Sequence, residues 1–488
     1  MPAVSSIPVR PARGPRLWLQ ALVCLAKVSL AYWLVSIAAP AASADVGVVL
    51  NESLDEDVDR ISSSGHSAVY FSRVCAESPV RLRLCRPGEA GSVMSNYINI
   101  GEDQPFEWNV VALNIYLFGV EDARNRPLFG SYRFKRLLED RYREKYLAGY
   151  CTTASCIDDQ KAEWREMVAA TLIRGVYIFS IRTTLEQDRQ FIAEFNDAAN
   201  KNHFNGLTHN CADFTKRIVN TYFPHSAKAD YLNDFGMTSP KAVARTFTHY
   251  ALHHPESQLR IMHFAQVPGT IKRSRIVRSG TEQLFHSGKL AVPMTLLAHY
   301  ALPVVTMSYL TMARFNVEKT FERLPASLFA PENGPPNPQQ QLLIVGTSAE
   351  WKERRRVLDA VIDESTAVEG RSELSQFFKQ IDETGTPYLD ENGAAWVEIS
   401  THGKPARIGL SASNIVAAAS DSALSYEFLL ARASRIVRSP AHARETMLEF
   451  QQDWANLGRA STRIALRKNT LTLRGAVAPP NPPSLMPR

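Results

Sequence analysis

The stretch Asn205-Gly-Leu-Thr-His-Asn-Cys-Ala-Asp-Phe214 has the form of a loop that delivers one cysteine to the first turn of a helix. Asn210 is a favourable N-cap residue, and Asp213 lies where the acidic partner of a capping box is found. Cys211 is then the first helical residue, where unpaired N–H groups and the positive end of the helix dipole favour a thiolate. This position predicts a nucleophilic cysteine.

The residues after Cys211 carry an apolar stripe. Phe214, Ile218 and Tyr222 recur at a spacing of four, so this side of the predicted helix packs against a core. Cys211 lies on the same side, which directs its thiol towards an inner cleft. A cysteine in the first turn of a capped helix is also common as a small buried hydrophobic residue. From this stretch alone both interpretations stay open.

The length and composition of the chain limit the kinds of protein that it can be. The chain has 488 residues, enough for two or three domains, and its net charge of +6 is mild. The balance of apolar and charged residues is that of a soluble globular protein. Nothing in it requires a nucleic acid, and we expect no nucleic-acid partner.

The N-terminus has the form of a secretory signal, residues 1–44. Three arginines lie within residues 10–16, an apolar stretch runs from Val28 to Ala39, and Ala42-Ser43-Ala44 fits a small-x-small cleavage site. Asp45 is then the expected mature start. An uncleaved membrane anchor over Leu17–Ala39 is the alternative. Either alternative exports the chain to the periplasm or cell envelope, the second with inner-membrane association.

Export changes the interpretation of the cysteines, because oxidising compartments favour pairing. Cys24 leaves with the signal, and five cysteines remain. Cys75 and Cys85 bracket a probable hairpin, and Cys151 and Cys156 close a short loop. Those two pairings leave Cys211 as the odd cysteine, which indicates a reactive thiol or an intermolecular link. Sequence alone does not fix the connectivity.

The first half of the chain predicts an α+β domain over residues 45–245. Residues 45–60 are acidic and are expected to be poor in strand. Runs rich in β-branched and aromatic residues predict strands, and 3.6-residue periodicity predicts helices. The expected strands are 67–74, 80–84, 106–118 and 175–181, and the expected helices are 134–149, 162–172 and 184–199, followed by the helix that begins at Cys211.

A helical region is expected over residues 246–323. Within it, residues 290–313 contain no Asp, Glu, Lys or Arg and approach transmembrane length. The basic cluster at 272–278 precedes this segment, so the positive-inside rule would place its upstream end in the cytoplasm and contradict export. A membrane span and a buried or interfacial hairpin broken at Pro303 both remain open.

A Pro-rich linker over residues 324–341 leads to a third region, residues 342–475. Helices are expected at 351–362, 373–381 and 422–465, with a strand at 406–410. Residues 387–399 predict a hairpin with Asn392-Gly393 in its turn. This is a largely helical C-terminal region with a small β-hairpin, and it carries no catalytic constellation. The Pro-rich tail, residues 476–488, is expected to be disordered.

A nucleophilic thiol needs a base, usually an imidazole. Of twelve histidines, His66 has the most suggestive setting, because it follows Gly65 at the mouth of a predicted strand. Considered alone, a histidine is more often an ordinary surface or packed residue. His253 and His254 are adjacent and do not share a helix face, and His203 and His209 lack an evident carboxylate set. We therefore expect no catalytic metal and no cofactor.

The segment 65–71, Gly-His-Ser-Ala-Val-Tyr-Phe, opens a strand, and the segment 210–214, Asn-Cys-Ala-Asp-Phe, opens a helix. This arrangement resembles the circularly permuted branch of the NlpC/P60 papain-like superfamily, in which His precedes Cys. That branch includes the lecithin:retinol acyltransferase-like proteins. Residues 176–223 also resemble an uncharacterised bacterial family of the same clan, the DUF4105 type. The resemblance covers roughly residues 60–225 and nothing after about residue 245.

The resemblance implies a permuted papain-like fold, an antiparallel sheet with packed helices. It implies that Cys211 is the nucleophile, that His66 is its general base, and that the reaction is acyl transfer through a thioester. The backbone N–H groups of Cys211 and Ala212 are then the oxyanion donors. The family's third polar residue, often a second His on the next strand, is missing here. Glu89, just past the returning strand, is the candidate for orienting His66.

Two functions follow as expectations. The first is an exported thiol-dependent hydrolase or acyltransferase, a cysteine peptidase, amidase or acyltransferase acting on an amide or ester of a cell-wall peptide or an acyl lipid. The second is a non-catalytic envelope binding or scaffold protein that retains the fold. Membrane association through residues 290–313 is a further expectation for either function.

Overall fold

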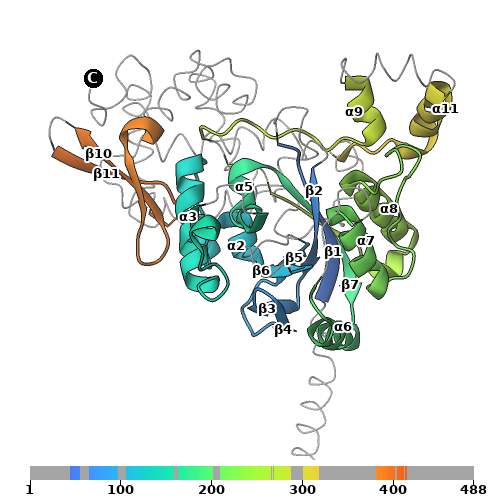
Figure 1. The fold of residues 1–488 in the computed structure, drawn as a ribbon, viewed down its shortest axis with the longest axis horizontal. Helices are drawn as coiled ribbons and strands as arrows, with labels where there is room; N and C mark the ends of the chain where they lie inside the picture. The colour runs from blue at the N-terminus through green and yellow to red at the C-terminus, as the bar shows by residue number, and fades with distance from the viewer. Residues whose placement is uncertain are drawn as a thin grey trace, which may run out of the picture. The chain divides into compact units, whose positions relative to one another are not determined.

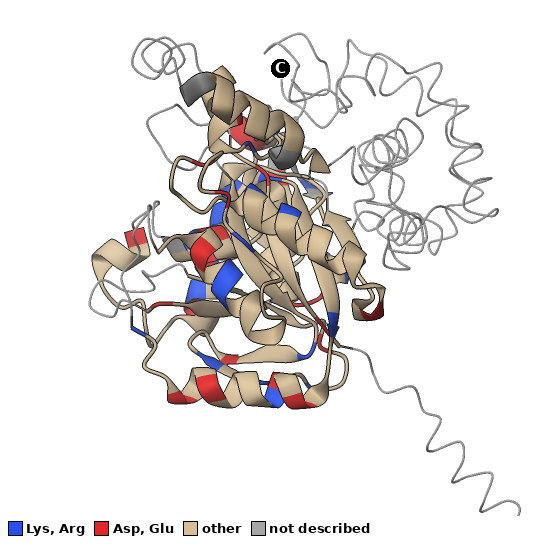
Figure 2. Ribbon diagram, turned by 90° about the vertical axis from the view of Figure 1, so that its right-hand side faces the viewer, with Lys and Arg blue, Asp and Glu red and all other residues tan. Residues whose placement is uncertain are grey.

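The computed structural model describes residues 44–54, 65–96, 106–158, 163–201, 209–264, 266–267, 269–286, 301–317, 381–401, 404–411 and 413–414. The chain divides into two compact units, Met1–Ser43 and Ala44–Arg488. The predicted signal lies outside the described residues apart from Ala44, as do the expected linker, most of the expected C-terminal helices and the tail. Acidic and basic residues are interspersed over the ribbon (Figure 2).

The centre of the second unit is a six-stranded antiparallel sheet in the order β6-β5-β2-β1-β7-β8 (Figure 1). Its strands are β1 (Ala44–Asn51), β2 (His66–Phe71), β5 (Ser92–Ser95), β6 (Asn109–Ala112), β7 (Val176–Thr183) and β8 (Arg260–Phe264). A separate hairpin is made by β3 (Val74–Ser78) and β4 (Arg81–Leu84). Because β8 pairs with β7, the sheet extends past residue 245, where the domain was expected to end.

Helices cover both faces of the sheet. Because successive side chains of each strand point to opposite faces, the strands contribute to two hydrophobic cores. On one face lie α6 (Leu185–Asp197), α7 (Cys211–Tyr222) and α8 (Pro240–His253). On the other lie α2 (Leu113–Phe118), α3 (Tyr132–Tyr146), η3 (Glu163–Met167) and α5 (Ala170–Ile173). The shorter elements are η2 (Ala123–Asn125), α4 (Ala154–Asp158), η4 (Pro255–Ser257), α9 (Gly280–His286), α11 (Ala301–Ser308) and η5 (Tyr309–Ala313). The expected α+β class with an antiparallel sheet is confirmed.

The expectation that residues 45–60 are poor in strand is wrong for their first half. All eight residues of β1 pair with β7, and six pair with β2. The acidic residues of this stretch lie mostly after Asn51, whereas the run from Val46 to Leu50 is apolar and fully buried. Gly47 permits the close pairing, because a Cβ there would collide with the carbonyl oxygen of Phe179.

The long strand expected at residues 106–118 is also wrong. Only Asn109–Ala112 is strand, and the chain then turns into α2, which ends at Gly119 with φ 75°. Nearly every residue of α2 is buried. A continuous apolar run of this length does not distinguish a buried strand from a buried helix. The helix expected at 162–172 is divided into η3 and α5, with Ala169 at φ 55° between them.

Other local expectations are confirmed. The helix α6 begins at a complete capping box between Thr184 and Gln187. The expected hairpin is β9 (Thr386–Leu389) and β10 (Ala395–Thr401), with Gly393 at φ 80° in its turn, and β11 (Lys404–Gly409) completes a three-stranded sheet. This small sheet does not form a separate hydrophobic core, because Val397 and Leu410 belong to the same core as residues of α2 and α3.

Part of the apolar segment 290–313 is described. Residues 301–308 form α11, and residues 309–313 continue as the π-helix η5. Among the described helices, none has the length and hydropathy needed to cross a membrane.

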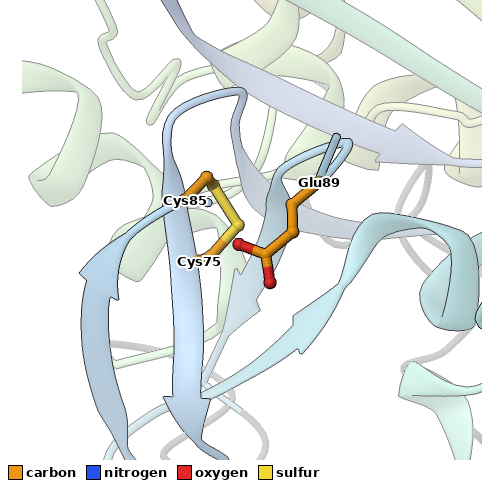
Figure 3. Close-up of side chains that lie close together, drawn as sticks. All are labelled: Cys75, Cys85 and Glu89. Carbon is orange, nitrogen blue, oxygen red and sulfur yellow. A yellow bond between two sulfur atoms is a disulfide. The ribbon is translucent and has the colours of Figure 1, made fainter. Parts of the chain in front are cut away.

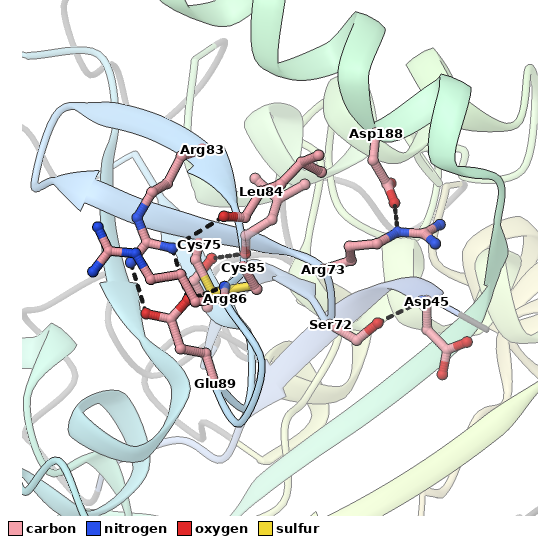
Figure 4. The surroundings of a disulfide bond; sticks show 12 residues. Asp45, Ser72, Arg73, Cys75, Arg83, Leu84, Cys85, Arg86, Glu89 and Asp188 are labelled. Carbon is pink, nitrogen blue, oxygen red and sulfur yellow. Dashed lines mark hydrogen bonds and ion pairs between the residues drawn. A yellow bond between two sulfur atoms is a disulfide. The ribbon is translucent and has the colours of Figure 1, made fainter. Parts of the chain in front are cut away.

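Both expected disulfides are present. Cys75 of β3 is bonded to Cys85, which directly follows β4 (Figure 3), and Cys151 is bonded to Cys156. Figure 4 shows that the first bond lies beside an ion pair between Arg83 and Glu89. Cys211 is the free cysteine of the described residues, as the odd count predicted.

The disulfides yield a stability prediction. The double substitution Cys75→Ala and Cys85→Ala should lower the free energy of unfolding by about 3 kcal/mol, because loop closure no longer restricts the unfolded chain. The matched double substitution Cys151→Ala and Cys156→Ala should cost less, about 2 kcal/mol, because its loop spans five residues rather than ten. Urea unfolding of the three proteins measures both values. An equal or reversed order would contradict the loop-closure explanation.

Candidate active site

The start of α7 is fixed by Asn210. Its side-chain oxygen accepts hydrogen bonds from the N–H groups of Ala212 (2.8 Å) and Asp213 (3.0 Å), and its amide donates to the carbonyl of Thr238 (3.0 Å). The predicted N-cap is therefore confirmed. Asp213 does not close a capping box and instead accepts from Thr238 and Lys216. The cap places Cys211 at the first helical position.

The helix then packs on β2 beside the residue that follows His66. The Thr215 hydroxyl lies 2.8 Å from the carbonyl oxygen of Cys211 and 3.2 Å from the hydroxyl of Ser67. Ser67 lies close enough to the Cys211 sulfur that hydrogen bonding from its N–H and its hydroxyl lowers the pKa of the thiol. The candidate nucleophile is thus held against the strand that begins with the candidate base.

His66 and Ser67 point to opposite faces of the sheet, because successive side chains of a strand alternate. On its own face, buried His66 lies between two polar neighbours. Its Nε2 is 3.0 Å from the hydroxyl of Ser95 on β5, and Asn51 is directly opposite it on β1. The Asn51 amide donates to the Tyr116 hydroxyl at 2.6 Å. Ser95 is therefore the polar side chain that the neighbouring strand β5 places against His66.

The pKa of His66 is lowered to about 3. Burial is the main cause, the Arg174 cation adds to it, and the Glu166 carboxylate partly opposes it. The imidazole is consequently neutral at neutral pH.

Burial also raises the pKa of the Cys211 thiol. The N–H and hydroxyl of Ser67 and the N–H of Ala212 oppose that effect by hydrogen bonding to the sulfur, whereas the Glu166 carboxylate adds to it. The helix start was expected to favour the thiolate, but here burial outweighs it. The resting site holds a neutral thiol and a neutral imidazole.

Sequence reasoning missed Glu166 of η3. It forms an ion pair with Arg174, whose side chain is 3% exposed, while that of Glu166 is 38% exposed. Burial opposes ionisation of Glu166, but Arg174 and His66 hold its pKa below the ordinary value. Its carboxylate is close enough to influence the pKa of both His66 and Cys211. One hundred residues separate it from His66, and no local pattern marks it.

Tyr116 of α2 was also missed. It is fully buried, and burial raises the pKa of its hydroxyl to about 12. Its oxygen accepts from Asn51, and its own proton goes to no acceptor within the described residues. The Cys211 sulfur is near enough to affect its pKa. Tyr116 is therefore a buried hydroxyl group that packs against Asn51, on the face of the sheet to which His66 points.

Glu89 does not orient His66. Both of its carboxylate oxygens accept from Arg83, at 2.6 and 2.7 Å, and one also accepts from the N–H of Arg86. These bonds, with Arg83 first, lower the pKa of Glu89 to about 2. The carboxylate lies beside the Cys75–Cys85 disulfide (Figure 3). The Arg83 guanidinium, on β4, binds the Glu89 carboxylate instead. The sequence did not reveal this pairing.

These three residues, Cys75, Cys85 and Glu89, form the one group of metal-ligand side chains within the described part of the chain. Their two sulfurs are bonded to each other. A disulfide sulfur is not a thiolate ligand, so this group cannot hold a metal through its cysteines in the oxidised state.

The expected oxyanion donors need one correction. The Ala212 N–H already donates to the side chain of Asn210 at 2.8 Å, so it is not available to a substrate oxygen. The Cys211 N–H, at the first helical position, has no acceptor within the helix. Of the expected pair of donors, the Cys211 N–H therefore remains as the candidate.

Comparison with protein-family models, with curated proteins and with solved structures finds no match to this chain. The chemistry of the site rests on its own geometry, which brings Cys211, Ser67, His66, Ser95 and Glu166 to one end of the central strands.

Ser67 yields a prediction about thiol reactivity. In Ser67→Ala the pKa of Cys211 should rise further, because a hydrogen bond to the sulfur is lost. Alkylation by iodoacetamide, followed against pH, should therefore shift to higher pH than in the unsubstituted protein. Ser92→Ala is the matched control, because Ser92 is also buried but donates to the carbonyl of Val74. A shift of equal size in both variants would refute the assignment to Ser67.

Proposed function

We propose that this chain is an exported thiol-dependent hydrolase or acyltransferase with a permuted papain-like, NlpC/P60-type domain. One observation carries the proposal: the free cysteine of the described residues begins a capped helix, and its sulfur is hydrogen-bonded by the residue next to His66. The four other described cysteines are paired. A thiol that forms no disulfide and lies beside the strand that begins with His66 supports the proposal that Cys211 is a nucleophile.

In the proposed reaction the Cys211 sulfur forms a bond to the carbonyl carbon of an amide or ester, and its proton passes to His66. The carbonyl π electrons move to the oxygen, which the Cys211 N–H stabilises. The tetrahedral species then expels an amine or alcohol, which takes the proton from His66. Water or an acceptor hydroxyl attacks the thioester, loses its proton to His66, and releases the acyl product and the thiol.

The roles of the neighbours follow from their contacts. In the imidazole tautomer that donates from Nε2 to Ser95, Nδ1 is the basic nitrogen of the ring. We assign Ser95 to hold this tautomer. Glu166 stabilises the imidazolium that forms, although its 38% exposure means that water screens part of this effect.

The substrate classes that suit this chemistry are a cell-wall peptide and an acyl lipid. The predicted signal supports a location in the periplasm or cell envelope. No step of the reaction requires a cofactor.

A second function, a non-catalytic envelope binding or scaffold protein, is favoured by the electrostatics. The pKa of His66 is lowered to about 3 and that of Cys211 is raised. A neutral, buried histidine and a neutral, half-buried cysteine, each with hydrogen-bonding neighbours, are also what a purely structural polar cluster contains.

Acyl transfer to Cys211 distinguishes the two functions. With p-nitrophenyl acetate at neutral pH, the enzyme should release nitrophenol and gain one acetyl group at Cys211 that hydroxylamine removes. His66→Ala should slow acetylation by about a hundredfold or more, because the proton acceptor is lost. Mass spectrometry and nitrophenol absorbance measure this effect.

His253→Ala is the matched control, because His253 is exposed on α8, outside the site. It should acetylate like the unsubstituted protein. If His66→Ala does so too, Cys211 is a packed thiol and the scaffold function stands.

A further inference from the structure

The helix formed by α11 and η5 exposes several large apolar side chains: Val304 and Met307 are each 60% exposed and Leu310 is 50% exposed. Two of its polar side chains bind the rest of the protein. The Ser308 hydroxyl accepts from Asn233 at 3.2 Å, and the Tyr309 hydroxyl donates to Glu282 at 2.5 Å. A helix whose outer side faces water has the opposite arrangement.

The exposed apolar residues extend beyond this helix. Leu232 and Phe235, in the loop between α7 and α8, and Phe285 of α9 are also exposed. The Phe235 ring lies against Gly280 at the start of α9, and the carbonyl of Asn233 accepts from Thr281. These contacts join the loop, α9 and α11 into one surface. We call it the α11 surface: Leu232, Phe235, Phe285, Val304, Met307 and Leu310.

Acidic side chains near this surface are held inward by partners. Asp230 pairs with Arg245 at 2.8 Å. Asp234 accepts from the Ser239 hydroxyl at 2.6 Å. Glu282 pairs with Lys241 at 2.6 Å. None of the three presents a free negative charge.

Exposed basic residues flank α9 and the α11–η5 helix in the sequence. Arg314 directly follows η5 and is exposed, and exposed Lys272 and Arg275 lie in the segment that leads into α9. Neither α11 nor η5 contains a charged residue, as the ribbon coloured by charge shows (Figure 2). Exposed apolar side chains flanked by basic residues are typical of protein elements that lie in the interface of an anionic membrane.

We infer that the α11 surface docks on an anionic lipid bilayer, with its apolar side chains in the interface and the flanking basic residues at the headgroups. The basic residues select an anionic lipid over a second copy of the chain, because the same surface on a second copy would bring like charges together. This inference does not depend on the proposed chemistry.

Docking would also orient the candidate site. Thr238, in the loop that carries Leu232 and Phe235, accepts from the amide of Asn210, the N-cap of the Cys211 helix. Arg275 pairs with Ser53, just past the end of β1 where Asn51 faces His66. The sheet end that holds the thiol is therefore the end that approaches the bilayer.

Flotation of the exported chain with vesicles tests this inference. The protein should float with vesicles of phosphatidylcholine plus phosphatidylglycerol, and markedly less with phosphatidylcholine alone. Leu310→Asp should weaken partitioning roughly tenfold or more, because it puts a charge into the apolar interface. The matched control is Leu185→Asp. Leu185 is also exposed, and it follows Thr183, the last residue of β7. This end of β7 lies more than ~20 Å along the strand from Val176, which is at the end near the candidate site.

Each other outcome overturns the inference. Flotation that Leu310→Asp leaves unchanged would assign binding to another part of the chain. An absence of flotation, together with a dimer that Leu310→Asp dissociates in sedimentation, would make this surface an interface between copies. Circular dichroism and the thermal midpoint of both variants establish that they are folded. Met307→Asp provides a second exposed position if Leu310→Asp is not folded.

Discussion

The pairing of β1 on both sides is the constraint on which the rest of the structure depends. This strand is hydrogen-bonded to β2 along one edge and to β7 along the other, so that Asn51 lies between His66 and Val176. The two neighbours bring different parts of the site. The β2 side supplies His66 and Ser67, and the segment before β7 supplies Arg174 with its partner Glu166. A one-residue slip of β2 would move His66 to the face of α7 and remove it from Ser95.

The alternation of a strand divides the site between the two cores. Ser67 faces the core of α7, where it contacts the Cys211 sulfur, and His66 faces the core of α2, where Asn51 and Tyr116 lie. Ser67 and His66 are consecutive residues of β2, so the two halves of the candidate site lie on opposite faces of the sheet at the start of one strand. This explains why the environment of the site is set by residues from both layers, and why no single segment of the sequence reveals it.

What could be predicted from the sequence was local. The N-cap of Asn210, the odd cysteine and the two disulfides depend on residues close together in the chain, and all are as expected. Ser95 and Glu166 depend on strand register and on packing between distant segments. They left no local signal. Glu89 was predicted to orient His66 because it follows the returning strand in the sequence. A carboxylate binds most strongly to a guanidinium, and the guanidinium of Arg83 lies within reach on β4.

The electrostatics of Cys211 follow from a comparison of magnitudes. A helix start favours a negative charge by about 0.3–1 kcal/mol, and up to about 2 kcal/mol when partly buried. Removing a charge from water costs several kcal/mol even after relaxation. Burial therefore dominates, and the hydrogen bonds from Ser67 recover only part of the cost. Since burial also keeps His66 neutral, neither group ionises alone; transferring the thiol proton to the imidazole creates two opposite charges that stabilise each other.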